Sequence, residues 1–251
     1  MIESVDLRVA DLERSRRFYL EAIGLEPVAE DPVALGAGGK PLVVLREAQP
    51  GTPAPPSSTG LFHLAILHPS RAELARALRR LVESGGGLDG ASDHAVSEAL
   101  YLHDPDFNDI ELYRDRPREE WPESDEGGVG MVTLPLDVQA LVAEADALDG
   151  RPAHADTIMG HVHLKVSDLE RSVAFYRDEL GMGVRARYGA QAAFLAHGDY
   201  HHHVGLNTWQ SQGGDPPPEG SAGLERFTIT GLQDDELSDP DGIAIRRQHA
   251  Q

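Results

Sequence analysis

The chain carries VDLRVADLERSRRFYLEAIGL at residues 5–25 and a second version, VHLKVSDLERSVAFYRDELGM, at residues 162–182. Both copies contain V-x-L-x-V-x-D-L-E-R-S, then Phe-Tyr, then a glycine. Each copy is typical of a short alternating strand, a helix N-cap and an amphipathic helix that ends at the glycine. Because internal similarity of this kind marks a duplicated structural unit, the stretch predicts a fold built from repeated strand–helix modules.

A second, weaker repeat completes the modular pattern. The segment GLFHLAI at 60–66 is similar to GLERFTI at 223–229, and the tripeptide DPD follows each of them. Together the repeats predict an α+β fold of four βαβββ modules, each a strand, a helix and three more strands. The glycine and the DPD are 44 positions apart in the first copy but only 16 apart in the second. The fourth module is therefore predicted to be truncated by about one helix and one strand.

Linkers rich in Pro, Gly and Ser mark the predicted boundaries. They are QPGTPAPPSS at 49–58 and GGDPPPEGSA at 213–222. A longer acidic connector at 116–157 divides an N-terminal half, 1–115, from a C-terminal half, 158–251. The predicted modules cover residues 1–48, 58–115, 158–211 and 222–248.

The composition limits the classes of function. Acidic residues number 42 against 22 Lys and Arg, a formal net charge of -20, so the chain should repel phosphate backbones and anionic lipid. We therefore expect no nucleic-acid partner and no membrane partner. The chain has no cysteine, so any metal must be held by His, Asp or Glu side chains. No apolar run reaches the roughly 20 residues of a membrane span and no secretory signal is present, which favours a cytoplasmic protein.

Three potential metal ligands fall in the two middle modules. Alignment of the repeats places His161 opposite Ser4 and His63 opposite Arg226. Glu111 lies on the strand after the first DPD, at a place where the fourth module offers no carboxylate. Two imidazoles and one carboxylate make a facial triad, which holds a divalent metal and leaves neighbouring coordination positions open. On spacing alone, a structural role is the commoner interpretation for a single strand histidine, and Glu111 could face solvent.

Several motifs resemble a known superfamily. The patterns DLERSxxFY, GLFHLAI and DPDxNxIELY look like those of the vicinal oxygen chelate superfamily, which contains glyoxalases and extradiol dioxygenases. The longer segments DHAVSEALYLHDPD, ELYRDRPREEWP, GHVHLKVSDLERS and YHHHVGLNTW resemble catechol 2,3-dioxygenases of the extradiol type. The resemblance covers nearly the whole chain except the shortened fourth module. It implies cleavage of catechol or a substituted catechol by O2 at Fe(II), with Mn(II) as the alternative metal.

The resemblance also implies roles for particular residues. The metal ligands would be His63, Glu111 and His161. His94 and Tyr101 would hydrogen-bond the substrate oxygens, and Tyr101 precedes Glu111 by the ten positions that the family shows. His203 would be the catalytic acid–base, taking a proton from the substrate and later returning one.

The run of histidines at 201–203 contains three different environments. If the run opens the last strand of the third module, alternation places His201 and His203 on one face and His202 on the other. We therefore expect His201 near the mouth of the substrate site and His202 to be structural or outward-facing. His163 should share the face of the ligand two residues before it, where it would support the ligands or touch the substrate.

The chain departs from the family in two respects. Family members typically build the site from the third and fourth modules, but the fourth module here lacks ligands, so we expect the second and third modules to pair. Phe107 and Asp109 stand where the family has glycines. This predicts strain at Phe107 if the turn needs a positive φ.

Two alternatives to a dioxygenase stay open. A glyoxalase-like isomerase or thiol transferase would place a second carboxylate on the last strand of the partner module, at the position of Gly205. A non-catalytic small-molecule-binding relative would typically lose the ligands that this chain keeps. For the dioxygenase, the expected partners are a small aromatic diol and O2, and the sequence does not distinguish a monomer from a homodimer.

Overall fold

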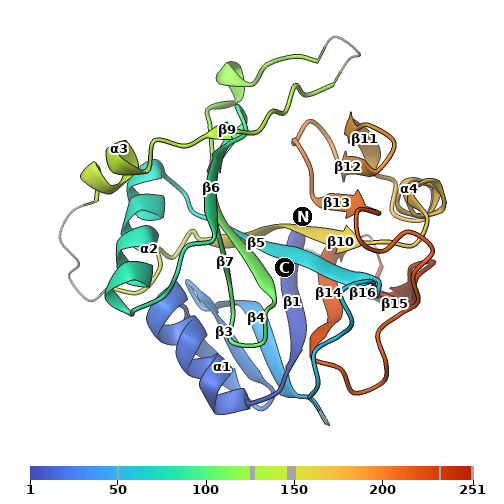
Figure 1. The fold of residues 1–251 in the computed structure, drawn as a ribbon, viewed down its shortest axis with the longest axis horizontal. Helices are drawn as coiled ribbons and strands as arrows, with labels where there is room; N and C mark the ends of the chain where they lie inside the picture. Colours follow the sequence, from blue (N-terminus) through green and yellow to red (C-terminus); the bar gives the residue numbers. More distant parts are fainter. Residues whose placement is uncertain (50, 125–127, 146–150, 232, 250–251) are drawn as a thin grey trace.

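The computed structural model describes residues 1–49, 51–124, 128–145, 151–231 and 233–249. Within them the chain forms two mixed β-sheets, one with seven strands and one with nine, and the larger sheet curls into a half-barrel (Figure 1). Parts of the predicted connector, at 125–127 and 146–150, and the last two residues of the C-terminal half lie outside the described residues. The α+β architecture agrees with the sequence-based expectation.

The first segment of the chain forms a strand, a helix and three further strands. These are β1 (Ile2–Val9), α1 (Leu12–Phe18), the π-helical turn η1 (Tyr19–Ile23), β2 (Glu26–Glu30), β3 (Val33–Ala37) and β4 (Lys40–Glu47). The helix begins where the Asp11 carboxylate accepts the Arg14 backbone N–H at 2.9 Å, the N-cap that the sequence predicts. The helical segment ends at Gly24, whose φ of 86° costs a glycine little.

The second segment has the same order of elements. These are β5 (Gly60–Leu67), α2 (Arg71–Glu83), β6 (Gly90–Asp93), β7 (Ser97–His103) and β8 (Asp109–Asp115). Ser70 caps α2 by accepting the Glu73 N–H, and an apolar stripe of the helix is buried. The connector that follows contains η2 (Arg118–Glu120), β9 (Leu134–Pro135) and α3 (Val138–Ala143).

The C-terminal half repeats the order once and then shortens it. Its first elements are β10 (Ile158–Lys165), α4 (Leu169–Asp178), β11 (Gly183–Tyr188), β12 (Ala192–Ala196) and β13 (Val204–Asn207). The last are β14 (Gly223–Gly231), β15 (Asp235–Ser238) and β16 (Ala244–His249). The described residues of this last segment contain no helix, as the shortened spacing predicts. None of the helices in the described part of the chain combines the length and apolar character of a membrane span.

Each sheet combines strands from both halves of the chain. The nine-stranded sheet has the order β11-β12-β13-β10-β5-β8-β7-β6-β9, and the seven-stranded sheet has the order β15-β16-β14-β1-β4-β3-β2. In the larger sheet β5 and β10 pair antiparallel and run side by side across the middle of the molecule (Figure 1). The expected pairing of the second and third segments is therefore confirmed. In the smaller sheet β1 pairs antiparallel with β14.

Alternation along the central strands separates the core from the inside of the half-barrel. On β5, Leu64 and Ile66 belong to the continuous hydrophobic core, and so do Val162 and Leu164 of β10. Side chains on neighbouring positions of a strand point to opposite faces. The odd-numbered positions between them therefore face the hollow side of the half-barrel, where the predicted ligands lie.

Two matched hydrogen bonds join the sheets. Tyr19 Oη donates to Asp104 Oδ2 at 3.1 Å, and Tyr176 Oη donates to Asp239 Oδ2 at 3.2 Å. The tyrosines come from the two DLERS repeats and the aspartates from the two DPD tripeptides. Each bond links a helical segment attached to one sheet with a turn attached to the other. The tyrosine–aspartate pair that is repeated in this chain therefore has a structural role, because each pair holds the two sheets together.

The turn between β7 and β8 carries one of the expected departures. Phe107 has a φ of 62°, so a residue other than glycine lies in the left-handed region, which is the condition under which strain was expected there. Its side chain is 73% exposed and stacks on His103 with ring centroids 5.1 Å apart. Asp109 nevertheless begins β8, and Glu111 follows within the regular strand. The altered turn therefore leaves the strand that carries the carboxylate in register.

Candidate metal centre and substrate pocket

Three neighbouring strands present the predicted ligands on the hollow face of the half-barrel. His63 lies on β5, Glu111 on β8 and His161 on β10, and β5 is the middle strand. Ala65 of β5 is opposite both His161 and Glu111 in the strand register. Because the alanine side chain ends at Cβ, the longer side chains on either side of it can reach across toward His63.

The three side chains converge through their donor atoms. Nε2 of His63 lies 3.1 Å from Oε2 of Glu111, and Nε2 of His161 lies 3.3 Å from the same oxygen. The two Nε2 atoms are 3.3 Å apart. A metal with bonds of roughly 2.0–2.3 Å would hold two ligands at right angles about 3 Å from each other. These separations therefore fit a facial triad around one divalent ion.

Burial and mutual contact set the charge of the ligands. All three are buried. Burial alone would raise the pKa of Glu111, but His161 and His63 outweigh it and hold this pKa well below its ordinary value. Burial lowers the pKa of His161 to about 4, although Glu111 acts in the opposite direction. The ionised Glu111 and the neutral His161 are the forms in which these two side chains bind a metal.

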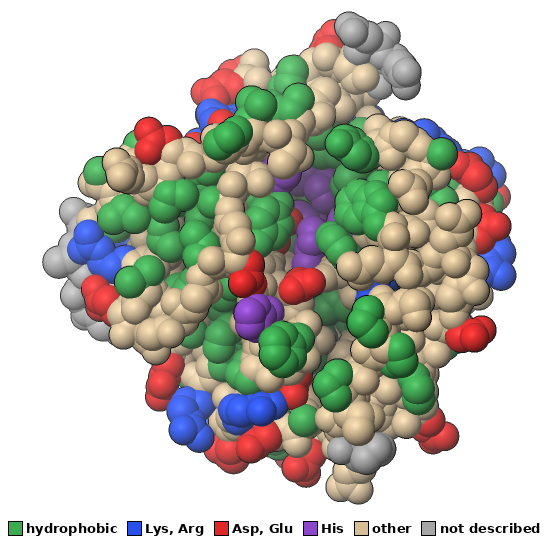
Figure 2. Space-filling view, in the orientation of Figure 1, with side chains coloured by type: hydrophobic (Ala, Val, Ile, Leu, Met, Phe, Trp, Pro, Cys, Tyr) green, Lys and Arg blue, Asp and Glu red, His purple; other side chains and the backbone are tan. Residues whose placement is uncertain are grey.

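His63 and Glu111 line a cavity of about 540 Å³, a volume typical of small-molecule sites. The space-filling view shows this hollow with histidine side chains at its floor and hydrophobic side chains around it (Figure 2). Phe62, Phe194 and Trp209 surround His163 with ring centroids 4.9, 5.6 and 5.6 Å away. Asn207 Nδ2 donates to His163 Nε2 at 3.0 Å. His163 therefore lies fixed in an aromatic wall beside the ligands, on the face that the sequence predicts.

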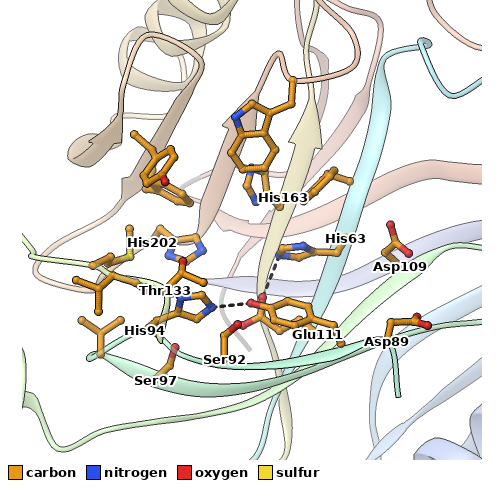
Figure 3. A pocket seen from close by; sticks show the side chains of 18 of the residues that line it. His63, Asp89, Ser92, His94, Ser97, Asp109, Glu111, Thr133, His163 and His202 are labelled. Carbon is orange, nitrogen blue, oxygen red and sulfur yellow. Dashed lines mark hydrogen bonds and ion pairs between the residues drawn. The ribbon is translucent and has the colours of Figure 1, made fainter. Parts of the chain in front are cut away.

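His94 lies across the cavity from His163 (Figure 3), and Tyr101 also lines the cavity. His94 Nε2 is 2.6 Å from Tyr101 Oη, and His94 Nδ1 is 2.7 Å from the Val132 carbonyl oxygen. Because a carbonyl only accepts, the His94 proton lies on Nδ1. Burial, together with the Glu111 carboxylate, raises the pKa of Tyr101 above its ordinary value. The structure thus brings both residues together next to the ligands.

The three consecutive histidines differ from the expected alternation. Residues 201–203 form a bend, and β13 begins only at Val204, so the expected strand over 201–203 is wrong. His202 is buried, lines the cavity and stacks on His161 with ring centroids 4.1 Å apart. The prediction that His202 faces outward is therefore wrong, because the bend shifts the alternation by one residue. Burial also lowers the pKa of His202 well below its ordinary value.

The other two histidines of the run lie away from the cavity lining. His201 is buried behind His202 instead of lying at the mouth of the site, and their Nδ1 atoms are 2.7 Å apart. His203 stacks on Tyr200 with ring centroids 4.8 Å apart, and its Nδ1 accepts the backbone N–H of His197 at 3.3 Å. The structure thus brings His202, and not His203, to the metal ligands.

Two groups of residues in this region were not predicted from the sequence. The connector supplies Met131, Val132 and Thr133 to the cavity wall, where β9 pairs with β6. Asp115 and Trp121 contact His201 from the side away from the cavity. Both lie in the ELYRDRPREEWP segment, so the family resemblance of that segment was the signal that could have found them.

The equivalent position of the other sheet holds an ion pair. Asp6 is opposite Arg226 there, as His163 is opposite His63 in the half-barrel. Asp6 Oδ2 lies 3.5 Å from Arg226 Nε and 3.7 Å from a nitrogen of Arg46. Such a cluster lacks the converging donor atoms of a metal site. Among the described residues, one group of side chains has the geometry to hold a metal, and it consists of His63, Glu111 and His161.

Comparisons with known proteins agree with this site. A family model described as the Glyoxalase/Bleomycin resistance protein/Dioxygenase superfamily matches residues 1–112 and 158–237. A Bacillus subtilis (strain 168) protein named catechol-2,3-dioxygenase is 43% identical over 249 residues, which cover 97% of this chain and 86% of that protein.

Solved structures share the fold. A putative dioxygenase from Bacillus subtilis subsp. subtilis str. 168 has a TM-score of 0.68 at 14% identity, covering 98% of this chain and 84% of that one. Glyoxalase I from Zea mays has a TM-score of 0.59 at 18% identity, covering 98% of this chain and 91% of that one. With its family match, its 43% identical relative and its buried triad, the chain belongs to the glyoxalase/bleomycin resistance protein/dioxygenase superfamily.

Proposed function

We propose that the protein is an extradiol dioxygenase, which cleaves the ring of catechol or a substituted catechol beside the diol with O2. The observation that carries the proposal is the facial triad at the floor of an aromatic-walled cavity. The 43% identity to a protein named catechol-2,3-dioxygenase supports the same reaction. Both oxygen atoms of O2 would enter the product, a muconic semialdehyde.

The proposed metal ligands are His63, Glu111 and His161, with Fe(II) as the metal and Mn(II) as the alternative. When bound, such a metal supplies a Lewis acid with neighbouring open positions for the diol oxygens and O2. The protein holds the three donor atoms together and orients the substrate. The aromatic wall around His163 would contact the flat face or edge of the substrate ring and exclude water from it.

Three side chains of the cavity would contact the substrate oxygens. His94 and Tyr101 form a hydrogen-bonded pair on one wall, and we assign them to binding the diol. We assign the acid–base role to His202 in place of His203, because only His202 lines the cavity and stacks on a ligand. Its Nδ1 is engaged by His201, which leaves Nε2 for a substrate hydroxyl.

Substitution of the two histidines separates these assignments. His202→Gln should keep its metal and lose kcat by about 10²–10⁴-fold, the usual contribution of a general acid–base group. His203→Gln should keep kcat within a few-fold. The opposite pattern would return the acid–base role to His203.

A glyoxalase-like reaction is less well supported by the cavity. Such an enzyme would need a second carboxylate at the position of Gly205. A Cβ atom at Gly205 would lie 2.8 Å from Cγ of His163, closer than real Cβ atoms approach. A side chain there therefore conflicts with the wall as it is built. A non-catalytic binder is disfavoured by the retained ligands.

The decisive experiment is anaerobic loading with Fe(II), followed by catechol and air. The expected result is uptake of O2 and appearance of the yellow ring-opened product, and a parallel Mn(II) sample compares the metals. The hemithioacetal of methylglyoxal and glutathione serves as the isomerase substrate. Turnover of the hemithioacetal without turnover of catechol would show that the protein is an isomerase and not a dioxygenase. Metal-free binding of catechol without turnover would favour a non-catalytic binding protein.

We also propose the division of the chain into four modules, at residues 1–48, 58–115, 158–211 and 222–248, with the last truncated. The two sequence repeats support this division. So does the order of one strand, one helical segment and three strands, which occurs three times before the shortened last segment.

A further inference from the structure

A continuous chain of hydrogen bonds runs from the end of β8 to the cavity. Asp115 Oδ1 lies 2.9 Å from His201 Nε2. His201 Nδ1 lies 2.7 Å from His202 Nδ1. The other oxygen of Asp115 accepts the Tyr200 hydroxyl at 3.0 Å. A carboxylate, one imidazole and then a second imidazole therefore lead from Asp115 to the cavity wall.

When His201 and His202 are both neutral, the hydrogen-bonding capacity of each group fixes where the protons lie. A carboxylate only accepts, so His201 donates to Asp115 from Nε2. A neutral His201 that donates from Nε2 has a lone pair on Nδ1, and this lone pair must accept. The donor to it is then His202 Nδ1–H. His202 Nε2, which makes no hydrogen bond to the described residues, is left without a proton.

The packing around His201 holds this arrangement. His201 is 1% exposed and lies between two aromatic rings, with Tyr200 at 4.1 Å and Trp121 at 5.1 Å between ring centroids. Asp115 keeps 24% of its side chain exposed, so the chain connects the cavity with the solvent side of the sheet. The imidazole of His201 therefore has one orientation, and both of its nitrogens are in use.

We propose that Asp115 and His201 are positioning residues, which fix His202 in the Nδ1–H tautomer and present its bare Nε2 to the substrate. The proposal rests on the proposed function, because it concerns the acid–base group of that reaction. A substrate hydroxyl would lose its proton to Nε2, so the O–H bond breaks and an N–H bond forms. The positive charge that results on His202 is stabilised through His201 by the Asp115 carboxylate.

The tautomer can be observed directly in the unmodified protein. Loaded with Zn(II) as a diamagnetic ion, the protein should show His202 as the Nδ1–H tautomer in long-range ¹H–¹⁵N spectra. The His202 signals are assigned by their loss in His202→Gln. An Nε2–H tautomer in the wild type would overturn the proposal. This measurement does not depend on turnover, so it separates failure of the inference from failure of the dioxygenase assignment.

Asp115→Asn tests the same arrangement by function. An amide has the size of the carboxylate but can donate to His201 Nε2, which would reverse both tautomers and place the proton on His202 Nε2. The Fe(II)-loaded variant should lose kcat for catechol by about 10²–10⁴-fold, with KM and metal content nearly unchanged. Its His202 spectrum should change to the Nε2–H form.

Two further variants separate positioning from a structural effect. Asp199→Asn removes a carboxylate from the loop that carries His201, where the Asp199 side chain is 89% exposed, and should keep kcat within two-fold. Tyr200→Phe keeps the ring over His201 and removes the hydroxyl that bonds both Asp115 and Tyr113. The bond between Asp115 and His201 remains, so this variant should keep kcat within a few-fold. If Asp115→Asn folds and retains kcat within a few-fold, or if KM and metal content fall in proportion to kcat, Asp115 has only a structural role.

Discussion

Gly205 should be intolerant of even one added methyl group. It faces the aromatic wall, and a Cβ atom built on it would lie 2.8 Å from His163 Cγ. Ordinary van der Waals contact begins near 3.4 Å, so the two groups must separate by about 0.6 Å. His163 has little freedom to move, because Asn207 bonds its ring and the aromatic side chains surround it.

The expected cost of Gly205→Ala is about 1–3 kcal/mol of the free energy of unfolding, the range for an over-packed core. Urea titration should show a lower midpoint at an unchanged slope. Because His163 lies 5.0 Å from His63 between ring centroids, we also expect weaker metal binding. A matched control is Gly183→Ala on β11 of the same sheet, where the nearest atom to a Cβ is 3.9 Å away. That variant should be neutral or up to about 1 kcal/mol more stable.

A double-mutant cycle tests the stated cause. In His163→Ala the obstructing ring is gone, so adding Gly205→Ala should cost less than about 0.5 kcal/mol. The coupling free energy between the two positions should then be about 1–3 kcal/mol. Additive effects, or a Gly205→Ala variant as stable as the wild type, would refute the steric reasoning.

Three further outcomes follow from the site and the core. Alanine in place of any of the three ligands should abolish stoichiometric metal binding, as measured by metal analysis. Ser4→Ala and Arg226→Ala, at the equivalent positions of the other sheet, should still bind the metal. Equal losses of metal in both sets of variants would contradict a single metal site. Catechols with uncharged substituents should have a higher kcat/KM than carboxylated ones, because the described cavity lining contains no Lys or Arg and does contain Asp109. Asp109→Asn should reduce this difference in kcat/KM between the two classes of catechol. Burial lowers the pKa of His68 to about 3. Between about pH 3 and pH 6.5 only the unfolded state binds this proton, so stability falls as the pH falls through that range. In acid unfolding curves His68→Leu should reduce the slope in that range by up to about 1.4 kcal/mol per pH unit, and an unchanged slope would mean that His68 takes up its proton when folded.

The sequence predicts the fold well because its signals are local and repeated. The DLERS repeat contains the strand alternation, the N-cap and the C-terminal glycine of each helix, and these features depend on neighbouring residues only. The pairing of β5 with β10 also followed, because the candidate ligands occur only in the second and third segments of the chain, to which these strands belong. The ligands His63, Glu111 and His161 could be predicted from the sequence for the same reason.

The parts that the sequence did not predict depend on contacts between distant residues. Alternation assigns the faces of His202 and His203 correctly only if the strand is regular, and the bend at 201–203 moves the pattern by one position. Asp115 and His201 are 86 positions apart, so no local pattern reveals their hydrogen bond. The contribution of residues 131–133 to the cavity wall likewise requires the path of the connector in space.

The pairing of strands across the two halves has a consequence for synthesis of the chain. When the first half has left the ribosome, β1 and β5 each have an unpaired edge, because their partners β14 and β10 are still to be made. The metal ligands cannot meet before residue 161 is available, since His63 and His161 are 98 positions apart. Contacts at such separation form slowly, and unpaired strand edges invite association with other chains. Slower synthesis at lower temperature should therefore raise the yield of folded, metal-binding protein relative to aggregate.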